Sequence, residues 1–161
     1  VQLLIGFESP SPDDLRGLEL KCDWKSVHMR GAAEAIRKIQ GHGITVLGCF
    51  VLGMDAQGLD CFDEVCRFCH ETELFDVQVT VLTPFPGTPL YARLLEEGRL
   101  LEPDAWHTCT LYDVNFVPRH MTPEELADGF RQLITRVYAP DETKWRRRCF
   151  RKHLRESNVE S

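Results

Sequence analysis

The stretch FDVQVTVLTPFPGTPLY, residues 75–91, decides the fold that the sequence predicts. It opens with a β-branched run at 77–82, which is typical of a strand buried in a parallel sheet. Prolines and a glycine then force the chain out of the sheet, since proline cannot donate to a strand ladder. Thr88 can cap a helix that has Pro89 at its first position and Gly98 beyond its end. The stretch therefore predicts a strand, a rigid loop and a helix.

Two similar units precede this stretch. Residues 1–5 and 44–52 read as buried strands, and helical periodicity covers about 26–40 and 57–72. Ser11 is predicted to cap a further helix directly after the first strand. The alternation of strand and helix predicts an α/β fold with a parallel sheet and right-handed crossovers. Because the chain begins inside a strand without a methionine, we expect a preceding portion to be missing.

Past Gly98 the alternation stops. Residues 106–118 mix aromatic and β-branched side chains and predict an extended or irregular segment. Thr122, Pro123 and Glu125 form a capping box with proline at the first helical position, and this helix is predicted to end before Pro140.

The last predicted helix, at 144–155, is strongly basic. It carries seven of the chain's 19 lysines and arginines and no acid. Trp145, Cys149, Phe150 and Leu154 give it an apolar stripe. We predict that it docks on the acidic remainder of the chain, with contact to an anionic partner such as RNA as the alternative.

Composition limits the classes of protein that fit. The 161 residues are 43% hydrophobic and 27% charged, which is ordinary for a globular domain, and the net charge of −6 argues against general nucleic-acid binding. No apolar run reaches membrane-spanning length and no signal peptide is present, which favours the cytoplasm. The odd count of seven cysteines fits reduced thiols.

Three cysteines have a spacing that suggests a metal site. Cys61, Cys66 and Cys69 form C-x4-C-x2-C, which resembles part of a ferredoxin site or half a zinc site. They lie, however, within a helical pattern, and no second pair of ligands accompanies them. We therefore assign no metal ligand and predict that these cysteines are buried as small hydrophobic side chains.

Three motifs together resemble the radical S-adenosylmethionine (SAM) enzymes. IGFES at 5–9, GITVLGCFVLGMD at 43–55 and VTVLTPFPGTPLY at 79–91 resemble the fourth, fifth and sixth strands of that family's barrel. The segment CTLYDVNFVPRHMTPEELADGF at 109–130 resembles the region after the barrel in members that carry a cobalamin-binding domain. The resemblance implies the second half, three βα units, of a partial (β/α)6 TIM-like barrel at 1–99, followed by a mainly helical C-terminal region at 100–161.

The resemblance also implies a cofactor site at the strand ends. Glu8 and Ser9 lie where the fourth strand approaches the SAM ribose, although from the local residues alone we favour a role in satisfying loop N–H groups. Gly53 ends the fifth strand, and Leu82, Thr83 and Pro84 pass the adenine. The family's four-iron four-sulfur cluster is bound by a CxxxCxxC loop in the barrel half that this chain lacks, so we assign no catalytic residue and expect the chain alone to be inactive.

In the family, reductive cleavage of SAM gives a 5′-deoxyadenosyl radical that abstracts hydrogen from substrate. A cobalamin-bearing member can then transfer a methyl group to an unactivated carbon, and the partner implied is a small-molecule or lipid-like substrate. Methylthiolation of tRNA is the alternative reaction. A noncatalytic RNA- or protein-binding remnant is the alternative of a different class.

Overall fold

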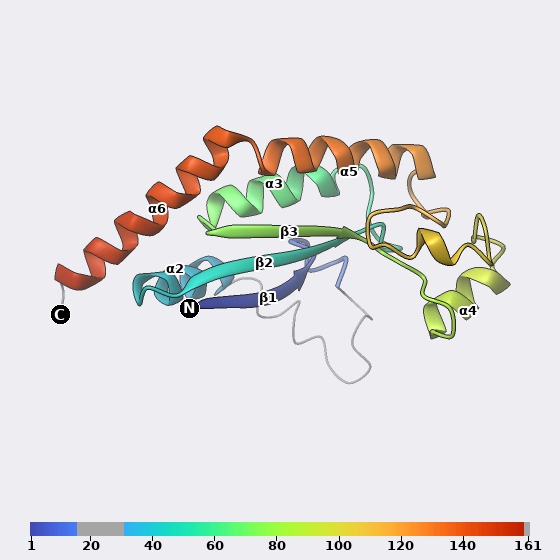
Figure 1. The fold of residues 1–161 in the computed structure, drawn as a ribbon, viewed down its shortest axis with the longest axis horizontal. Coiled ribbons are helices and arrows are strands. Elements are labelled where there is room, and N and C mark those ends of the chain that lie inside the picture. Colours follow the sequence, from blue (N-terminus) through green and yellow to red (C-terminus); the bar gives the residue numbers. More distant parts are fainter. Residues whose placement is uncertain (16–30, 160–161) are drawn as a thin grey trace.

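The computed structural model describes residues 1–15 and 31–159 (Figure 1). The strands in this part are β1 (Gln2–Glu8), β2 (Thr45–Leu52) and β3 (Asp76–Val81). The helices are α2 (Ala32–Gly41), α3 (Cys61–Glu71), α4 (Pro89–Glu96), α5 (Pro123–Val137) and α6 (Pro140–Val159), with a short 3-10 helix η2 (Trp106–Thr108).

The sheet is parallel, with the strand order β1-β2-β3. Each crossover leads to the next strand in the same direction, and right-handed crossovers of this kind place their helices on one face of the sheet. Figure 1 shows α3, α5 and α6 together on one side of the sheet and α4 beyond the end of β3. The predicted α/β fold, a run of βα units followed by helices, is confirmed.

The core lies between the sheet and these helices. Alternate residues of β2 and β3 are buried on that side, namely Val46, Phe50, Leu52, Val77, Val79 and Val81. We call the opposite side the open face; it carries Leu4, Gly6, Leu47, Cys49, Val51, Gln78 and Thr80, none of which is fully buried. In a closed barrel, this side of the sheet would face the interior.

Aromatic packing holds β1 and β2 against α3. The ring of Phe7 lies 5.8 Å from that of Phe50 and 5.2 Å from that of Phe68. Gly48 makes room for the Phe7 ring, because a Cβ atom at Gly48 would lie 3.1 Å from it. The register of the first two strands is therefore tied to a close approach that only glycine allows.

The prediction that residues 1–5 are buried is wrong. Leu3 and Leu4 are 43% and 62% exposed, because β1 is the outer strand of the sheet and no described element pairs with its other edge. The strand also runs further than predicted, to Glu8.

Two predicted helix starts also differ. Residues 12–15 form a turn rather than the first turn of a helix capped by Ser11, and 16–30, where that helix and the start of the next were predicted, lie outside the described residues. Helix α3 begins at Cys61 instead of Gln57. The cause is that the Gln57 side chain is used within the preceding turn, as described below.

The predicted caps of two helices are confirmed. The Thr88 hydroxyl accepts a hydrogen bond from the Tyr91 N–H at 3.2 Å, with Pro89 at the first position of α4. At α5 the capping box is complete, since the Glu125 N–H donates to Thr122 and the Thr122 N–H donates to the Glu125 carboxylate. Between the two helices, 97–122 is largely irregular, as predicted for its middle part.

The basic helix docks on the body of the domain, as predicted. It begins earlier than expected, at Pro140. The Trp145 ring stacks on His70 with centroids 4.0 Å apart, and Phe150 packs edge-on against Phe75 at 4.9 Å. At the far end His153 Nε2 lies 2.5 Å from a Glu73 carboxylate oxygen. None of the helices in the described part of the chain has the length and apolarity that a membrane crossing requires.

Candidate functional site

The strand ends meet at one edge of the sheet. Phe50 pairs with Glu8, and Leu52 pairs with Val81, so the last residues of all three strands lie near one another. Glu8, Gly53 and Leu82 therefore share the carboxyl edge, where parallel α/β folds bind their ligands.

Glu8 has an unusual backbone at this edge. Its φ of 65° is left-handed, and the register between β1 and β2 shifts between Gly6 and Glu8. One carboxylate oxygen lies 2.8 Å from the position that a Cβ atom on Gly6 would occupy. The bulge thus turns the Glu8 carboxylate back over Gly6 and onto the open face. Strained conformations of this kind gather at functional sites.

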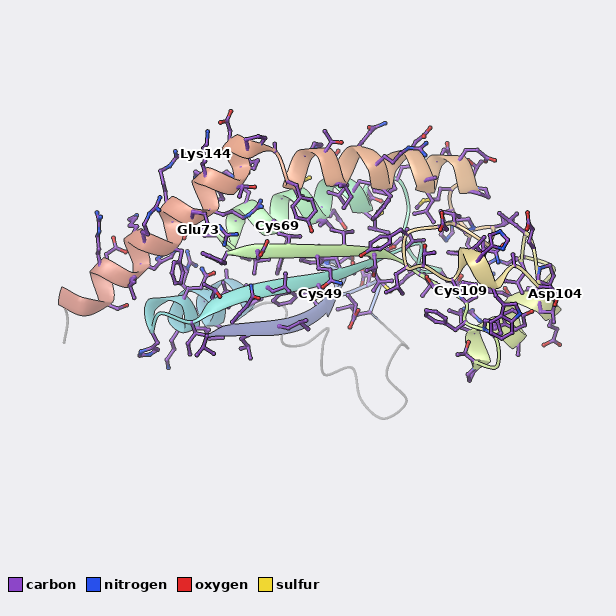
Figure 2. All side chains as sticks on the ribbon, viewed as in Figure 1. Cys49, Cys69, Glu73, Asp104, Cys109 and Lys144 are labelled. Atoms are coloured by element: carbon purple, nitrogen blue, oxygen red, sulfur yellow. The ribbon has the colours of Figure 1, made fainter. Side chains whose placement is uncertain are left out.

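A row of residues crosses the open face next to this carboxylate. Gly6 pairs with Cys49, and Cys49 pairs with Gln78. The Cys49 sulfur lies 3.8 Å from Gln78 Oε1. Burial raises the pKa of the Cys49 thiol, and the negative charge of Glu8 raises it further, which places Glu8 and Cys49 in the same region. Figure 2 shows Cys49 on β2 and Cys69 on the helix side of the sheet.

Ser9 is fully buried and serves the turn after β1. Its hydroxyl donates to Asp14 at 2.6 Å and accepts from the Ser11 N–H at 3.1 Å. Burial raises the pKa of Asp14, while the hydrogen bond from Ser9 opposes that rise. The Ser9 side chain therefore positions the segment that follows Glu8.

Gly53 is required by backbone geometry and by packing. Its φ of 92° is left-handed, and a Cβ atom there would lie 2.8 Å from both Leu126 and Phe116. The Gln57 side chain accepts from the N–H groups of Gly53 and Met54 and donates to the Val51 carbonyl. This buried amide fixes the turn, and sequence analysis missed it because a glutamine near a helix start carries no distinctive pattern.

The loop after β3 also lies at the carboxyl edge of the sheet. The Leu82 N–H donates to the Leu52 carbonyl at 2.8 Å, so the ladder extends one residue past β3. The Thr83 hydroxyl donates back to the Val81 carbonyl at 3.0 Å, and both Thr83 and Pro84 are buried. Local hydrogen bonds thus hold this predicted site segment in a single shape.

Sequence analysis also missed an ion-pair network beside Gly53. The Asp55 carboxylate accepts from Arg93 and from Arg99, the latter at 2.9 Å, and Arg119 lies 3.4 Å away. Glu97 binds Arg99 and Arg119 from the other side. Burial alone would raise the pKa of Asp55, but the hydrogen bonds from the two arginines outweigh it and hold that pKa below its ordinary value. The network ties α4 and the segment after it to the end of β2.

Two of the three cysteines of α3 are buried as the sequence predicts, whereas Cys66 is only partly buried. Cys61 and Cys69 are buried, and burial raises the pKa of each thiol to about 12. Such thiols stay protonated at neutral pH and are poor metal ligands. Within 1–15 and 31–159, no group of three or more His, Cys, Asp or Glu side chains is arranged to hold a metal ion.

The C-terminal part of the chain matches a known protein family. The model of a family described as a domain of unknown function, DUF4070, matches residues 88–161. This domain is the C-terminal domain of cobalamin-binding radical SAM methyltransferases. The C-terminal part of this chain therefore resembles that of radical SAM methyltransferases.

Several curated relatives of this chain are named as methyltransferases. A bacteriochlorophyllide d C-12(1)-methyltransferase of Chlorobaculum tepidum is 28% identical over 134 residues, which are 83% of this chain and 28% of the relative. A hopanoid C-2 methylase of Rhodopseudomonas palustris is 24% identical over 86% of this chain and 24% of its own length. An uncharacterized methyltransferase of a Synechocystis species is 26% identical over 86% of this chain and 25% of its own length. The chain thus spans about a quarter of the length of these relatives.

Proposed function

We propose that this chain forms the ribose and adenine side of the SAM site in a radical SAM methyltransferase that methylates carbon. The relatives named above support the methyltransferase class. The rest of such an enzyme, including the other half of the barrel, would be supplied by sequence outside these residues.

The conformation of Glu8 is the observation that carries this proposal. A left-handed backbone at a bulge directs a carboxylate onto the face that a closed barrel would enclose. A carboxylate accepts hydrogen bonds from a pair of ribose hydroxyls, and such bonds are stronger than those between neutral groups. Glu8 is therefore proposed as the acceptor for the ribose.

The other predicted site residues act through the backbone or through packing. Ser9 is proposed as a positioning residue for Glu8, since its hydroxyl is used by Asp14 and Ser11. Gly53, Leu82, Thr83 and Pro84 are proposed to form the wall along the adenine, with Gln57 and the Asp55 network holding that wall in place.

Cys61 and Cys69 of α3 do not fit as ligands of an iron–sulfur cluster. Cluster ligands are thiolates, whereas the thiols of Cys61 and Cys69 are buried and protonated. We propose that the cluster is bound by the other barrel half, and that cobalamin is bound by a further domain. When bound, SAM and these cofactors supply the radical chemistry and the methyl group. This chain would bind and orient SAM and would keep water out of the site.

The substrate is proposed to be a small, largely apolar molecule. The names of two relatives specify a bacteriochlorophyllide and a hopanoid, both modified at carbon. The open face fits such a substrate, because it combines aliphatic side chains such as Leu47 and Val51 with the polar row at Cys49 and Gln78. Titration of SAM into the full-length protein and a Glu8→Ala variant tests the proposal.

A further inference from the structure

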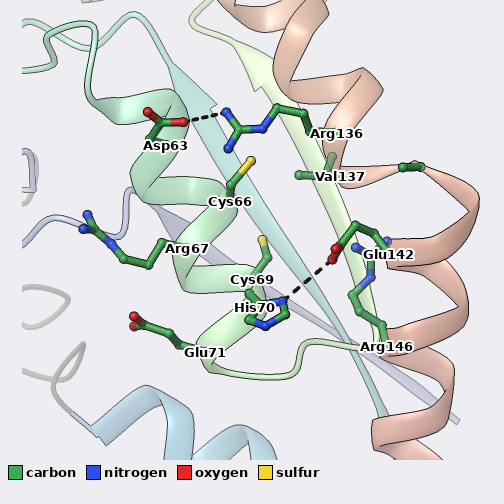
Figure 3. A pocket seen from close by; sticks show the side chains of 11 residues that line it. Asp63, Cys66, Arg67, Cys69, His70, Glu71, Arg136, Val137, Glu142 and Arg146 are labelled. Atoms are coloured by element: carbon green, nitrogen blue, oxygen red, sulfur yellow. Dashed lines mark hydrogen bonds and ion pairs between the residues drawn. The ribbon is translucent and has the colours of Figure 1, made fainter.

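A cavity lies on the helix side of the sheet. It measures about 660 Å³ and is formed between α3 and the corner at which α5 meets α6 (Figure 3). Its walls include Cys69 and His70 from α3, Arg136 from α5, and Glu142 and Arg146 from α6. The open face is on the other side of the sheet, so this cavity is separate from the proposed SAM site.

Arg146 is the unusual residue of this cavity. It is 2% exposed, and its Nε has no hydrogen-bond partner. Its only hydrogen bond in the described part of the chain is a long one, 3.5 Å, from Nη2 to the Thr143 hydroxyl, and no carboxylate there forms an ion pair with it. A buried charge without a counter-charge is costly, so a role in folding alone does not explain this arginine.

Its neighbour Arg147 also has a buried nitrogen, Nη1, without a hydrogen-bond partner, but the rest of its guanidinium makes contacts that serve docking. The Arg147 guanidinium lies 3.5 Å above the centre of the Phe75 ring, and one nitrogen is 3.8 Å from the Asp76 carboxylate. Both contacts join α6 to the sheet. Arg146 has no comparable contact, so the docking of α6 does not account for it.

Two exposed ion pairs among the other charges of the cavity can rearrange. Arg136 is paired with Asp63, and His70 lies 3.8 Å from Glu142. All four side chains are between 46% and 76% exposed, and ion pairs with that exposure are weak. The Cys69 thiol beside Arg146 supplies no negative charge, because burial raises its pKa to about 12.

We propose that this cavity binds a small oxyanion, a phosphate or a carboxylate group, through the buried guanidinium of Arg146. A guanidinium presents parallel N–H donors that match two oxygens of either group. Arg136, from α5 on the same side of the cavity, can act as a second cation when its exposed ion pair with Asp63 opens. The volume fits a small metabolite that carries the anionic group.

The test uses the protein at its natural full length, with inorganic phosphate and acetate as separate probes. Thermal unfolding and calorimetric titration are expected to give a rise in Tm and a binding isotherm with one or both anions. A response to phosphate alone identifies a phosphate group as the ligand chemistry, and a response to acetate alone identifies a carboxylate. In Arg146→Met the affinity falls by at least about tenfold and the rise in Tm disappears.

Without anion, Arg146→Met is expected to unfold at the same temperature as the wild type or higher, because an apolar side chain replaces an uncompensated charge. Arg148→Met is the matched control, since it removes an exposed charge from the same helix outside the cavity and should leave binding unchanged. Arg146→Lys keeps the charge but loses the paired donors, and should bind weakly while folding normally.

Three results would overturn the proposal. One is the absence of binding of either anion by the wild type. Another is binding by Arg146→Lys and Arg146→Met that equals the wild type. The third is a lower Tm for both variants with no response to anions in any protein, which would make Arg146 a structural residue satisfied by water.

Discussion

One carboxylate oxygen of Glu8 lies 2.8 Å from the position that a Cβ atom on Gly6 would occupy. The two residues flank the bulge of β1, and the absence of a side chain at Gly6 is what lets the carboxylate rest there. Glycine at position 6 and a left-handed glutamate at position 8 thus form one unit. The proposed ribose site depends on both.

Gly6→Ala is expected to displace the Glu8 carboxylate and to weaken SAM binding in the full-length protein. Stability should change by less than about 0.5 kcal/mol, because the atom that must move is the end of a flexible side chain. Gly48→Ala is the contrasting variant. Its Cβ would lie 2.7 Å from Leu74 in the core, so overpacking should cost roughly 1–3 kcal/mol. Denaturant unfolding and SAM titration of both variants check this, and equal stability losses would contradict it.

Thiol labelling tests whether Cys49 faces the proposed site. In the full-length protein, saturating SAM should slow alkylation of Cys49, since Cys49 lies next to Glu8 on the open face. Cys66 is the control. It is also partly buried, but it lines the cavity between α3 and the α5–α6 corner and should be labelled at an unchanged rate. Mass spectrometry of the labelled peptides gives both rates. Protection of Cys66 with no protection of Cys49 would place SAM on the wrong side of the sheet.

Asp55 is expected to stabilise the domain at neutral pH and to lose this effect in acid. Its pKa is lowered on folding, so its contribution is fully present above the unfolded value of about 3.9 and is lost as pH falls through the folded value. Asp55→Asn should be less stable at neutral pH and should lose less stability on acidification. Urea unfolding at neutral pH and below about pH 4 measures the difference. Parallel pH dependences for the two proteins would show that the arginine network does not act through Asp55.

The docking of α6 predicts a stability loss when its aromatic contact is removed. Phe150→Ala should cost roughly 1–3 kcal/mol, because a half-buried ring that packs on Phe75 is lost. Arg151→Ala, an exposed change on the same helix, should stay within about 0.5 kcal/mol. Equal effects of the two changes would indicate that α6 is held by charge rather than by packing.

The sequence predicted the three strands and the caps of α4 and α5, because those features are encoded locally, whereas the cap predicted at Ser11 was wrong. Each β-branched run specifies its own strand. Thr88 with Pro89 specifies the start of α4, and the capping box at Thr122 specifies the start of α5. Exposure of β1 was not predictable in this way, since an apolar strand has the same composition whether or not a neighbour covers its edge.

The candidate site was only partly predictable, because several of its contacts form only when distant segments come together. Strand ends indicated Glu8, Gly53 and Leu82, but the hydrogen bonds of Ser9 and Gln57 depend on how the turns close. The Asp55 network joins residues that are 38 and 44 positions apart in sequence, and the unpartnered Nε of Arg146 appears only when α6 packs on α3. Contacts of that range follow from the fold and have no local pattern.

The central claim is that Glu8 accepts hydrogen bonds from the ribose of SAM. Hydrogen bonds to a charged acceptor contribute roughly 1.5–3 kcal/mol, so Glu8→Ala should weaken SAM binding about ten- to a hundredfold. Glu8→Gln keeps one acceptor oxygen and should lose less. Glu34→Gln removes an exposed carboxylate from α2 and should have no effect.

Calorimetric titration of SAM into these variants of the full-length protein, with iron content measured in parallel, is the most direct test. The account predicts the affinity order wild type, Glu8→Gln, Glu8→Ala, with unchanged iron. Unchanged SAM affinity in a folded Glu8→Ala variant, or loss of iron from it, would contradict the account and make Glu8 a structural residue of the β1 turn.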